Sequence, residues 1–318
     1  MRILPLLVVL AGGLAAAEAP LPPGAKPVNL GSVGADEGPA WHPDGYLYFT
    51  GHEGILRRNA SGKTEVFRAG GGPNGLLFDA QGRLLVCEAT GRRVIRIEAD
   101  GKVTVLAERY EGHRFNSPND LTVDSKGRIY FTDPRYGKRD DMEMGVEAVY
   151  RIDAPGKITR LTNRELERPN GIFATPGDQY LYVADNNNNN VGGARKLYRF
   201  RLKPDGTLDL ASRKLIFDWQ NGRGPDGLKL DREGRIWVAG GVTRSNRYES
   251  ADRFKGGVYV LSPEGKLLEF IAVPVDEVTN CAFGGPGYHT LFITAGGTLW
   301  SIPTSTEGLV PFHGAPAR

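Results

Sequence analysis

Six oxygen-bearing side chains occupy equivalent positions in six copies of one motif, which is Pro-Asn-Gly in its simplest form. They are Glu37, Asn74, Asn119, Asn170, Asp226 and Asn280. Two are carboxylates and four are carboxamides, with no His or Cys among them. Carboxylate and carbonyl oxygens are the ligands that hard divalent cations prefer. Several protein oxygens in a wide ring suit Ca²⁺ best, whereas Zn²⁺, Mn²⁺ and Mg²⁺ remain open alternatives.

A single Asn or Asp beside a glycine is more often a turn residue than a ligand. The recurrence at six equivalent positions favours the cation site. Two carboxylates crowded at the mouth of a channel would also repel each other and be poorly solvated without a cation. The sequence therefore predicts a ring of cation ligands, provided that the fold brings the six positions together.

The repeat that carries these positions predicts the fold. Each copy contains two short apolar strands joined by a glycine turn, then a strand such as VYRI, a second turn and a fourth strand. The intervals between aligned positions run from 37 residues (Glu37 to Asn74) to 56 (Asn170 to Asp226), and a four-stranded propeller blade needs roughly 40 to 50. We therefore expect an all-β fold, a six-bladed β-propeller with four-stranded antiparallel blades around a central metal-binding channel. The aligned residues begin the innermost strands, so they should converge on one face.

The beginning of the chain predicts export. Arg2 precedes an apolar run from Ile3 to Ala17, and Ala17-Glu18-Ala19 has the small residues of a cleavage site. We expect residues 1–19 to be a signal peptide, residues 20–318 to form a single propeller domain, and the mature protein to be periplasmic or secreted. The strand-like stretch near Asn29 should pair with the last repeat and close the ring.

Composition excludes several classes of partner. The 318 residues include 40 basic and 37 acidic side chains, a net charge of +3 without a long basic run, so nucleic acid is not an expected partner. No segment after the signal peptide has the apolar length of a membrane span. A closed propeller leaves no long sheet edge, which favours a monomer. Cys87 and Cys281 lie in apolar strands and are expected to be buried free thiols rather than a disulfide.

Several motifs also resemble a known family. Asn116–Gly137 reads NSPNDLTVDSKGRIYFTDPRYG and Arg168–Ile172 reads RPNGI, with GPDGL and TNCAFGG in support. Together they resemble the SMP-30, gluconolactonase and luciferin-regenerating-enzyme-like family over nearly the whole mature chain. The resemblance implies a catalytic divalent metal, usually Ca²⁺, held by Glu37, Asn170 and Asp226, with Asn119 as a further ligand or substrate contact. It also implies that Asp226 is the catalytic carboxylate.

One departure limits what the resemblance implies. Sugar-lactone members of the family have an Arg just before the motif that matches Pro118-Asn119-Asp120, and this chain has Ser117 and Pro118 there. The sugar specificity of those members is therefore not carried over to this chain.

The chemistry that fits is hydrolysis of a small lactone or ester, with the metal polarising the carbonyl. Asp226 would act as a general base toward water or attack the substrate directly, and the sequence does not separate the two roles. Substrate contacts are expected from Asn74, Asn119, Asp120 and Asn280.

A phosphotriesterase or arylesterase on the same metal is one alternative, and a non-catalytic Ca²⁺-stabilised binding module is another. The sequence lacks G-x-S-x-G, C-x-x-C, H-E-x-x-H and phosphate-loop motifs.

Three long loops are expected to shape the mouth of the site because they follow second strands, which return to the metal face. They span Pro134 to Glu147, Asn186 to Lys196 and Gly241 to Gly257. Their cations could favour an anionic substrate, but nearby acidic residues favour ordinary ion pairing. Asp133 and Asp185, which end two second strands, are either supports for the ring or strand-end caps, and His52 is a weaker candidate for the mouth.

Overall fold

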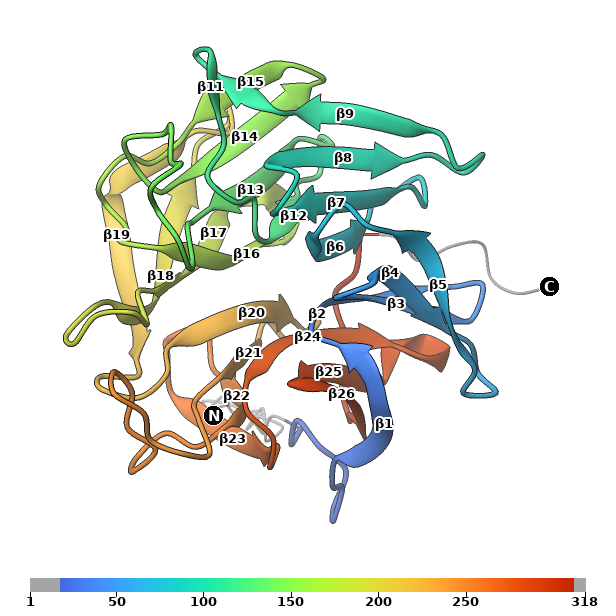
Figure 1. Cartoon of the computed structure of the whole chain (residues 1–318). Coiled ribbons are helices and arrows are strands. Elements are labelled where there is room, and N and C mark those ends of the chain that lie inside the picture. The colour runs from blue at the N-terminus through green and yellow to red at the C-terminus, as the bar shows by residue number, and fades with distance from the viewer. Residues whose placement is uncertain (1–17, 312–318) are drawn as a thin grey trace, which may run out of the picture.

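The computed structural model describes residues 18–311 and confirms the six-bladed propeller. Six four-stranded antiparallel sheets surround a central axis, and the strands nearest the axis are β2, β6, β12, β16, β20 and β24 (Figure 1). Residues 1–17 of the predicted signal peptide lie outside the described residues. No helix in the described part of the chain is long and apolar enough to cross a bilayer.

The first three blades follow one another along the chain. Blade 1 consists of β2 (Glu37–His42), β3 (Tyr46–Gly51), β4 (Gly54–Arg58) and β5 (Thr64–Ala69). Blade 2 consists of β6 (Pro73–Phe78), β7 (Leu84–Glu88), β8 (Arg93–Ile97) and β9 (Val103–Ala107). A small hairpin of β10 (Arg109–Tyr110) and β11 (His113–Arg114) precedes blade 3, which consists of β12 (Leu121–Val123), β13 (Ile129–Asp133), β14 (Ala148–Ala154) and β15 (Lys157–Arg160).

The last three blades include the longest strand of the propeller, β19, and the strand that closes the ring, β1. Blade 4 consists of β16 (Pro169–Ala174), β17 (Tyr180–Asn186), β18 (Arg195–Leu202) and β19 (Leu208–Asp218). Blade 5 consists of β20 (Pro225–Leu230), β21 (Ile236–Gly240), β22 (Gly257–Leu261) and β23 (Leu267–Ala272). Blade 6 consists of β24 (Val278–Gly284), β25 (Thr290–Ala295), β26 (Gly297–Pro303) and β1 (Val28–Ala35). Short 3-10 turns, η1 (Pro176–Asp178) and η2 (Pro286–Tyr288), join first to second strands in blades 4 and 6.

Strand β1 closes the ring as expected. It pairs antiparallel with β26, with Val28 opposite Ser301 and Ser32 opposite Thr298. The outer strand of the last blade thus comes from the beginning of the described chain, so the two ends of the propeller are held by backbone hydrogen bonds.

The core lies between the faces of adjacent blades. Trp237 of blade 5 meets Phe283 of blade 6 edge to face, with ring centroids 5.2 Å apart. The expectation of two free thiols is confirmed, since Cys87 and Cys281 are buried and unpaired to each other. Successive side chains of an inner strand point to opposite faces of the blade, so Leu76 packs in the layer shared with blade 1 and Leu77 in the layer shared with blade 3.

A glycine follows the ring residue in four blades and lets the inner strands approach closely. A Cβ added at Gly38, Gly75, Gly171 or Gly227 would overlap an atom of the next blade's ring residue: the backbone oxygen of Asn74, Asn119 or Asp226, or the side chain of Asn280. The glycine of the Pro-Asn-Gly motif is thus a packing residue where neighbouring inner strands touch.

Apolar side chains fill the far end of the channel. Trp41, Phe78, Phe173 and Phe283 meet there with the C-terminal stretch 309–311, and together they leave a void of about 30 Å³. The Leu309 N–H donates to the Leu230 carbonyl of the inner strand β20 at 2.9 Å, which fixes this stretch against the channel.

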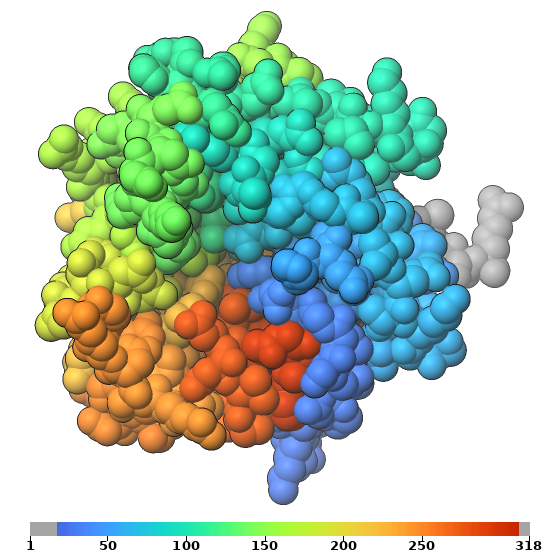
Figure 2. Space-filling model, in the orientation of Figure 1, coloured from blue at the N-terminus to red at the C-terminus, as the bar shows by residue number. Residues whose placement is uncertain are grey.

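The long loops have the bounds expected from the sequence to within two residues. They run between β13 and β14 (134–147), between β17 and β18 (187–194), and between β21 and β22 (241–256). Figure 2 shows the segments around 134–147, in green, and 241–256, in orange, standing on the face seen in Figure 1, with the surface hollowed near the middle of the ring.

Candidate active site

A cavity of about 680 Å³ opens at the centre of the ring, and five of the six predicted ring residues line it. They are Glu37, Asn74, Asn119, Asn170 and Asp226. The sixth, Asn280, is buried and is not part of the lining. The first residues of successive inner strands therefore do converge on one face.

Glu37 is partly buried and receives its hydrogen bonds on one oxygen. Its Oε2 accepts from the Gly38 N–H and, at 2.8 Å, from Asn280 Nδ2. Burial raises the pKa of Glu37, and the charges of Asp226 and Asp120 raise it further. The Oε1 atom is the oxygen available to a ligand, and a positive charge in the cavity would stabilise the ionised carboxylate.

Asp226 shares the same cavity and is held from one side by Arg223. Arg223 Nη2 donates to Asp226 Oδ2 at 3.1 Å, and Arg223 Nη1 lies 2.9 Å from Glu277 Oε1. Burial raises the pKa of Asp226 and the Arg223 charge opposes that rise. The guanidinium thus fixes one carboxylate oxygen and leaves Oδ1 as the one that can meet water or substrate.

Asn170 presents an unpaired oxygen. Its Nδ2 donates to the Tyr136 hydroxyl at 2.9 Å, whereas its buried Oδ1 has no hydrogen-bond partner among the described residues. Buried polar atoms are nearly always paired in folded proteins. The orphaned oxygen therefore points to a ligand that this position binds.

Asn74 and Asn119 are fixed through their backbones. The Asn119 carbonyl accepts from the Gly75 N–H at 2.7 Å, and the Asn74 carbonyl accepts from the Thr50 hydroxyl at 2.9 Å. Both residues line the cavity. Their amide groups can contact either a cation or the hydroxyl groups of a substrate.

Asp120 and Asn280 lie one layer below the cavity floor. Asn280 Nδ2 reaches Asp120 Oδ2 at 3.4 Å as well as Glu37, and both residues are buried without lining the cavity. Burial raises the pKa of Asp120. In this position Asn280 and Asp120 can support Glu37 from below. Their contact with substrate stays a prediction.

Asp133 and Asp185 fix the segments that lead into two ring residues. Asp133 accepts backbone N–H groups of Asn116 and Ser117, each at 2.8 Å, just ahead of Asn119. Asp185 accepts the Arg168 N–H at 2.7 Å, just ahead of Asn170. The two sequence interpretations therefore merge, because each carboxylate caps its strand end and thereby supports the ring.

Two of the three long loops line the cavity. Residues 135–138 and Asp141 come from the first loop, and Asn188 and Asn189 come from the second. The expectation for the third loop is wrong, because residues 241–256 contribute nothing to the lining. Glu249 of this loop instead lies with its Oε1 atom 3.7 Å from Arg223 Nη1. The third loop folds back on the segment before β20, and residues just before and at the start of β24, Glu277 and Thr279, take its place. His52, in the turn after β3, is also outside the lining.

Two of the loop cations form ion pairs with acidic residues of their own loop. Arg135 pairs with Asp141, and Arg139 pairs with Glu147. Arg195 is an exception to the solvated-charge interpretation, since it is buried and its guanidinium donates to backbone carbonyls, including that of Gly222 at 3.1 Å. The expected ion pairing is therefore confirmed for Arg135 and Arg139.

The donor set fits a hard divalent cation. Within residues 18–311 no group of three or more His, Cys, Asp and Glu side chains is arranged to hold a metal ion, so carboxamides must complete any such site. Glu37 and Asp226 offer two carboxylates, and the charge of Asp226 raises the pKa of Glu37, while Asn170 offers one orphaned amide oxygen. Oxygen-only donors of this kind match Ca²⁺ or a similar hard ion better than soft metals.

The family model described as the SMP-30/Gluconolactonase/LRE-like region matches residues 35–297, which include all of blades 1 to 5 and part of blade 6. The chain belongs to this family. It is 30% identical to a gluconolactonase of Zymomonas mobilis over 301 residues, covering 86% of this chain and 79% of that protein.

Solved structures of similar proteins share the propeller fold. A gluconolactonase of Xanthomonas campestris superimposes with a TM-score of 0.74 and 33% identity, covering 90% of this chain and 91% of that one. A calcium-binding protein, regucalcin, from Agrobacterium tumefaciens shares the fold with a TM-score of 0.69 and 22% identity, covering 90% and 97%. The lactonases among these relatives support a lactone-hydrolysing function for the family.

Several residues of the site were not found by sequence reasoning. Arg92, Tyr136, Arg223 and Glu277 line the cavity from loops and segments that precede or follow the inner strands. The repeat alignment could not select them, because these segments differ between blades in length and composition. Tyr136 lies inside the quoted Asp-Pro-Arg-Tyr-Gly stretch, and Arg223 stands three residues before Asp226, so proximity to motif residues was the available signal.

Proposed function

We propose that this protein is a metal-dependent lactonase that opens the ring of a small, hydroxylated lactone. The observation that carries the proposal is the convergence of Glu37, Asp226 and the orphaned Asn170 oxygen in one polar cavity. Glu37, Asn170 and Asp226 would hold the cation, Ca²⁺ in the first instance, with Asn119 beside them. The bound cation would supply Lewis-acid polarisation of the lactone carbonyl.

The lining favours a hydroxylated substrate over an aromatic or aliphatic one. Carboxamides, hydroxyls and charged groups make up most of the wall, including Asn188, Asn189, Thr90 and Thr279, while Ala89 and the Tyr136 ring are the main apolar surfaces. Such a wall can exchange hydrogen bonds with a polyol through many of its side chains. This supports a lactone of a polyhydroxylated acid.

The side chains of the site have separate roles in the proposed reaction. Asp226 Oδ1 accepts a proton from the attacking water, because Oδ2 is occupied by Arg223. Arg223 keeps the carboxylate oriented, and the side chains of Asn74 and Asn119 orient the substrate through its hydroxyl groups. Asn280 and Asp120 support Glu37 from below. Direct attack by Asp226 on the carbonyl carbon would use the same oxygen and form a transient mixed anhydride, with the ring oxygen leaving as a hydroxyl group of the opened acid; water would then hydrolyse the anhydride.

The test is hydrolysis of glucono-δ-lactone, an unsubstituted γ-lactone and an aryl ester, followed with a pH indicator. Metal-stripped protein should be inactive, and added Ca²⁺ should restore turnover, fastest on the hydroxylated lactone. Turnover of the aryl ester or a phosphotriester alone would favour the alternative hydrolase. Tight cation binding and a raised melting temperature without turnover on any substrate would favour a binding module.

We also propose that the enzyme acts outside the cytoplasm. The support is the predicted signal peptide 1–19, and the test is N-terminal sequencing of the protein from the exported fraction. A mature chain beginning at Pro20 is the expected result, whereas an intact Met1 in the cytoplasmic fraction would contradict the proposal.

A further inference from the structure

Tyr136 touches a proposed cation ligand, although it lies outside the repeated motif. It belongs to the 134–147 loop of blade 3 and lines the cavity. Its hydroxyl lies between two residues of blade 4: it accepts from Asn170 Nδ2 at 2.9 Å and donates to the Asn186 carbonyl at 3.2 Å. The loop of one blade thus contacts the start of the inner strand and the end of the second strand of the next.

The direction of these two hydrogen bonds fixes the Asn170 amide. A tyrosine hydroxyl carries a single hydrogen, and the Asn186 carbonyl can only accept, so that hydrogen is directed toward Asn186. The hydroxyl then offers Asn170 only a lone pair, which an amide N–H can meet and an amide oxygen cannot. Asn170 must therefore turn Nδ2 to Tyr136 and Oδ1 away from it, and this Oδ1 is the buried atom without a partner.

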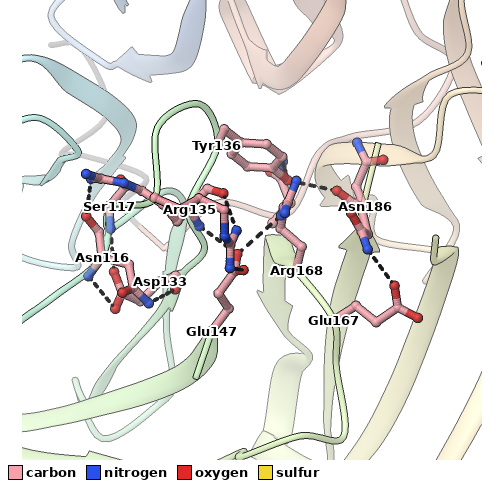
Figure 3. Close-up of polar contacts among 12 residues, drawn as sticks. Asn116, Ser117, Asp133, Arg135, Tyr136, Glu147, Glu167, Arg168 and Asn186 are labelled. Atoms are coloured by element: carbon pink, nitrogen blue, oxygen red, sulfur yellow. Dashed lines mark hydrogen bonds and ion pairs between the residues drawn. The ribbon is translucent and has the colours of Figure 1, made fainter. Parts of the chain in front are cut away.

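The Tyr136 ring is itself held in place from blade 4. The Arg168 guanidinium lies 5.2 Å from the ring centroid, within the range of a cation–π contact. Arg168 Nε lies 3.2 Å from Glu147 Oε2, and the same oxygen accepts the Arg135 N–H at 2.7 Å. Figure 3 shows the Tyr136 ring beside Arg168, with Glu147 reaching toward Arg168 from the other side. Arg135 and Glu147, near the two ends of the 134–147 loop, are thereby linked to Arg168, which lies two positions before Asn170.

We propose that Tyr136 is a positioning residue that sets the amide orientation of Asn170, so that the Asn170 oxygen rather than its nitrogen faces the cation. The inference rests on the proposed function, because it needs Asn170 to be a cation ligand. An amide nitrogen is not a ligand for Ca²⁺, since its lone pair is delocalised and its hydrogens repel the ion. A flipped Asn170 would therefore remove one ligand without any change of sequence at the site.

The test is calorimetric titration of Ca²⁺ into the metal-stripped mature protein and its Tyr136→Phe variant. Loss of a group that orients a metal ligand typically weakens metal binding about 10- to 100-fold, and we expect a loss in that range. The matched control is Tyr130→Phe. Tyr130 is a buried tyrosine of the same blade whose hydroxyl donates to Asp124 Oδ2 at 2.9 Å, outside the cavity lining. That variant should lose stability while keeping its Ca²⁺ affinity.

A second measurement isolates the orientation effect. In an Asn170→Asp background both side-chain oxygens can ligate, so adding Tyr136→Phe should then weaken Ca²⁺ binding by less than about threefold. An equal loss in both backgrounds would overturn the orienting role, and so would unchanged Ca²⁺ affinity in a folded Tyr136→Phe single variant. Wild-type protein that binds neither Ca²⁺ nor Mg²⁺, Mn²⁺ or Zn²⁺ would instead overturn the proposed metal site, and the inference with it.

Discussion

Asn280 Nδ2 lies 2.8 Å from Glu37 Oε2 and so joins the innermost strand of the last blade to that of the first. The same amide reaches Asp120 Oδ2 of blade 3 at 3.4 Å, across the channel. One carboxamide thereby connects three blades directly beneath the cavity. The carboxylate that we propose as a cation ligand is therefore positioned by closure of the whole ring and not by its own strand alone.

Replacing Asp226 by Asn should abolish lactone turnover while the fold is retained. The substitution keeps the shape of the side chain but removes the basic oxygen, and loss of a general base typically lowers the rate about 10²- to 10⁴-fold. The measurement is kcat for the preferred lactone at saturating Ca²⁺, with circular dichroism to check the fold. Asp100→Asn, at an exposed turn after β8, is the matched control and should keep full activity. Wild-type kcat in folded, cation-loaded Asp226→Asn would disprove the catalytic role.

Without a cation, the protein should lose stability as the pH rises. Burial and the neighbouring carboxylates raise the pKa of Glu37 above its usual value of 4.5. The folded state then holds a proton on Glu37 that the unfolded chain releases, so the free energy of unfolding falls as the pH increases above about 4.5. Urea denaturation in the presence of a chelator, repeated across pH, measures this slope.

Two comparisons make the pH prediction specific to the site. Glu37→Gln should flatten the decline, whereas Glu264→Gln, at an exposed turn, should not. Saturating Ca²⁺ should oppose the decline in the wild type, because it binds the ionised carboxylate and the folded state only. A pH slope that is identical in Glu37→Gln and the wild type would show that other groups cause it.

A methyl group at Gly171 should disrupt the ring. A Cβ there would overlap the Asp226 carbonyl, whereas a Cβ at Gly145, in the 134–147 loop, would meet open space. Overpacking in a tightly packed interior typically destabilises a protein by about 1–3 kcal/mol. We expect Gly171→Ala to lower the melting temperature and the Ca²⁺ affinity, and Gly145→Ala to change neither. Equal behaviour of the two variants would mean that the inner strands can move apart freely.

The two cysteines should be unreactive in the folded protein. Cys87 and Cys281 are fully buried, and desolvation raises the pKa of both thiols, which disfavours the nucleophilic thiolate. Ellman's reagent should therefore label neither thiol in native protein and both in unreduced protein unfolded by guanidinium. Absence of labelling after unfolding would reveal a disulfide, contrary to the structure.

Sequence reasoning located the inner strands well because their signal repeats. Glu37, Asn74, Asn170 and Asp226 begin β2, β6, β16 and β20 or stand second in them, as the aligned motif predicted. The periodic pattern also predicted the pairing of the segment near Asn29 with the last blade, since a closed ring needs a fourth strand there.

The walls of the site were less predictable because they depend on loop conformation. The expectation that residues 241–257 border the cavity failed, since Glu249 faces the back of Arg223 and a neighbouring segment supplies Glu277 instead. Nothing in the repeat distinguishes Asn280 from the ring residues that line the cavity. Its burial beneath Glu37 follows from the side-chain direction of one inner strand, which a motif alignment does not specify.

The packed far end of the channel has a consequence for turnover. Residues 309–311 and four aromatic rings leave about 30 Å³ there, room for a water molecule or two but not for a sugar acid. For the lactonase that we propose, substrate and product would therefore share a single entrance, so each hydroxy acid would have to leave before the next lactone could enter. At high product concentration the acid would compete for that entrance, and inhibition by product should follow a competitive pattern.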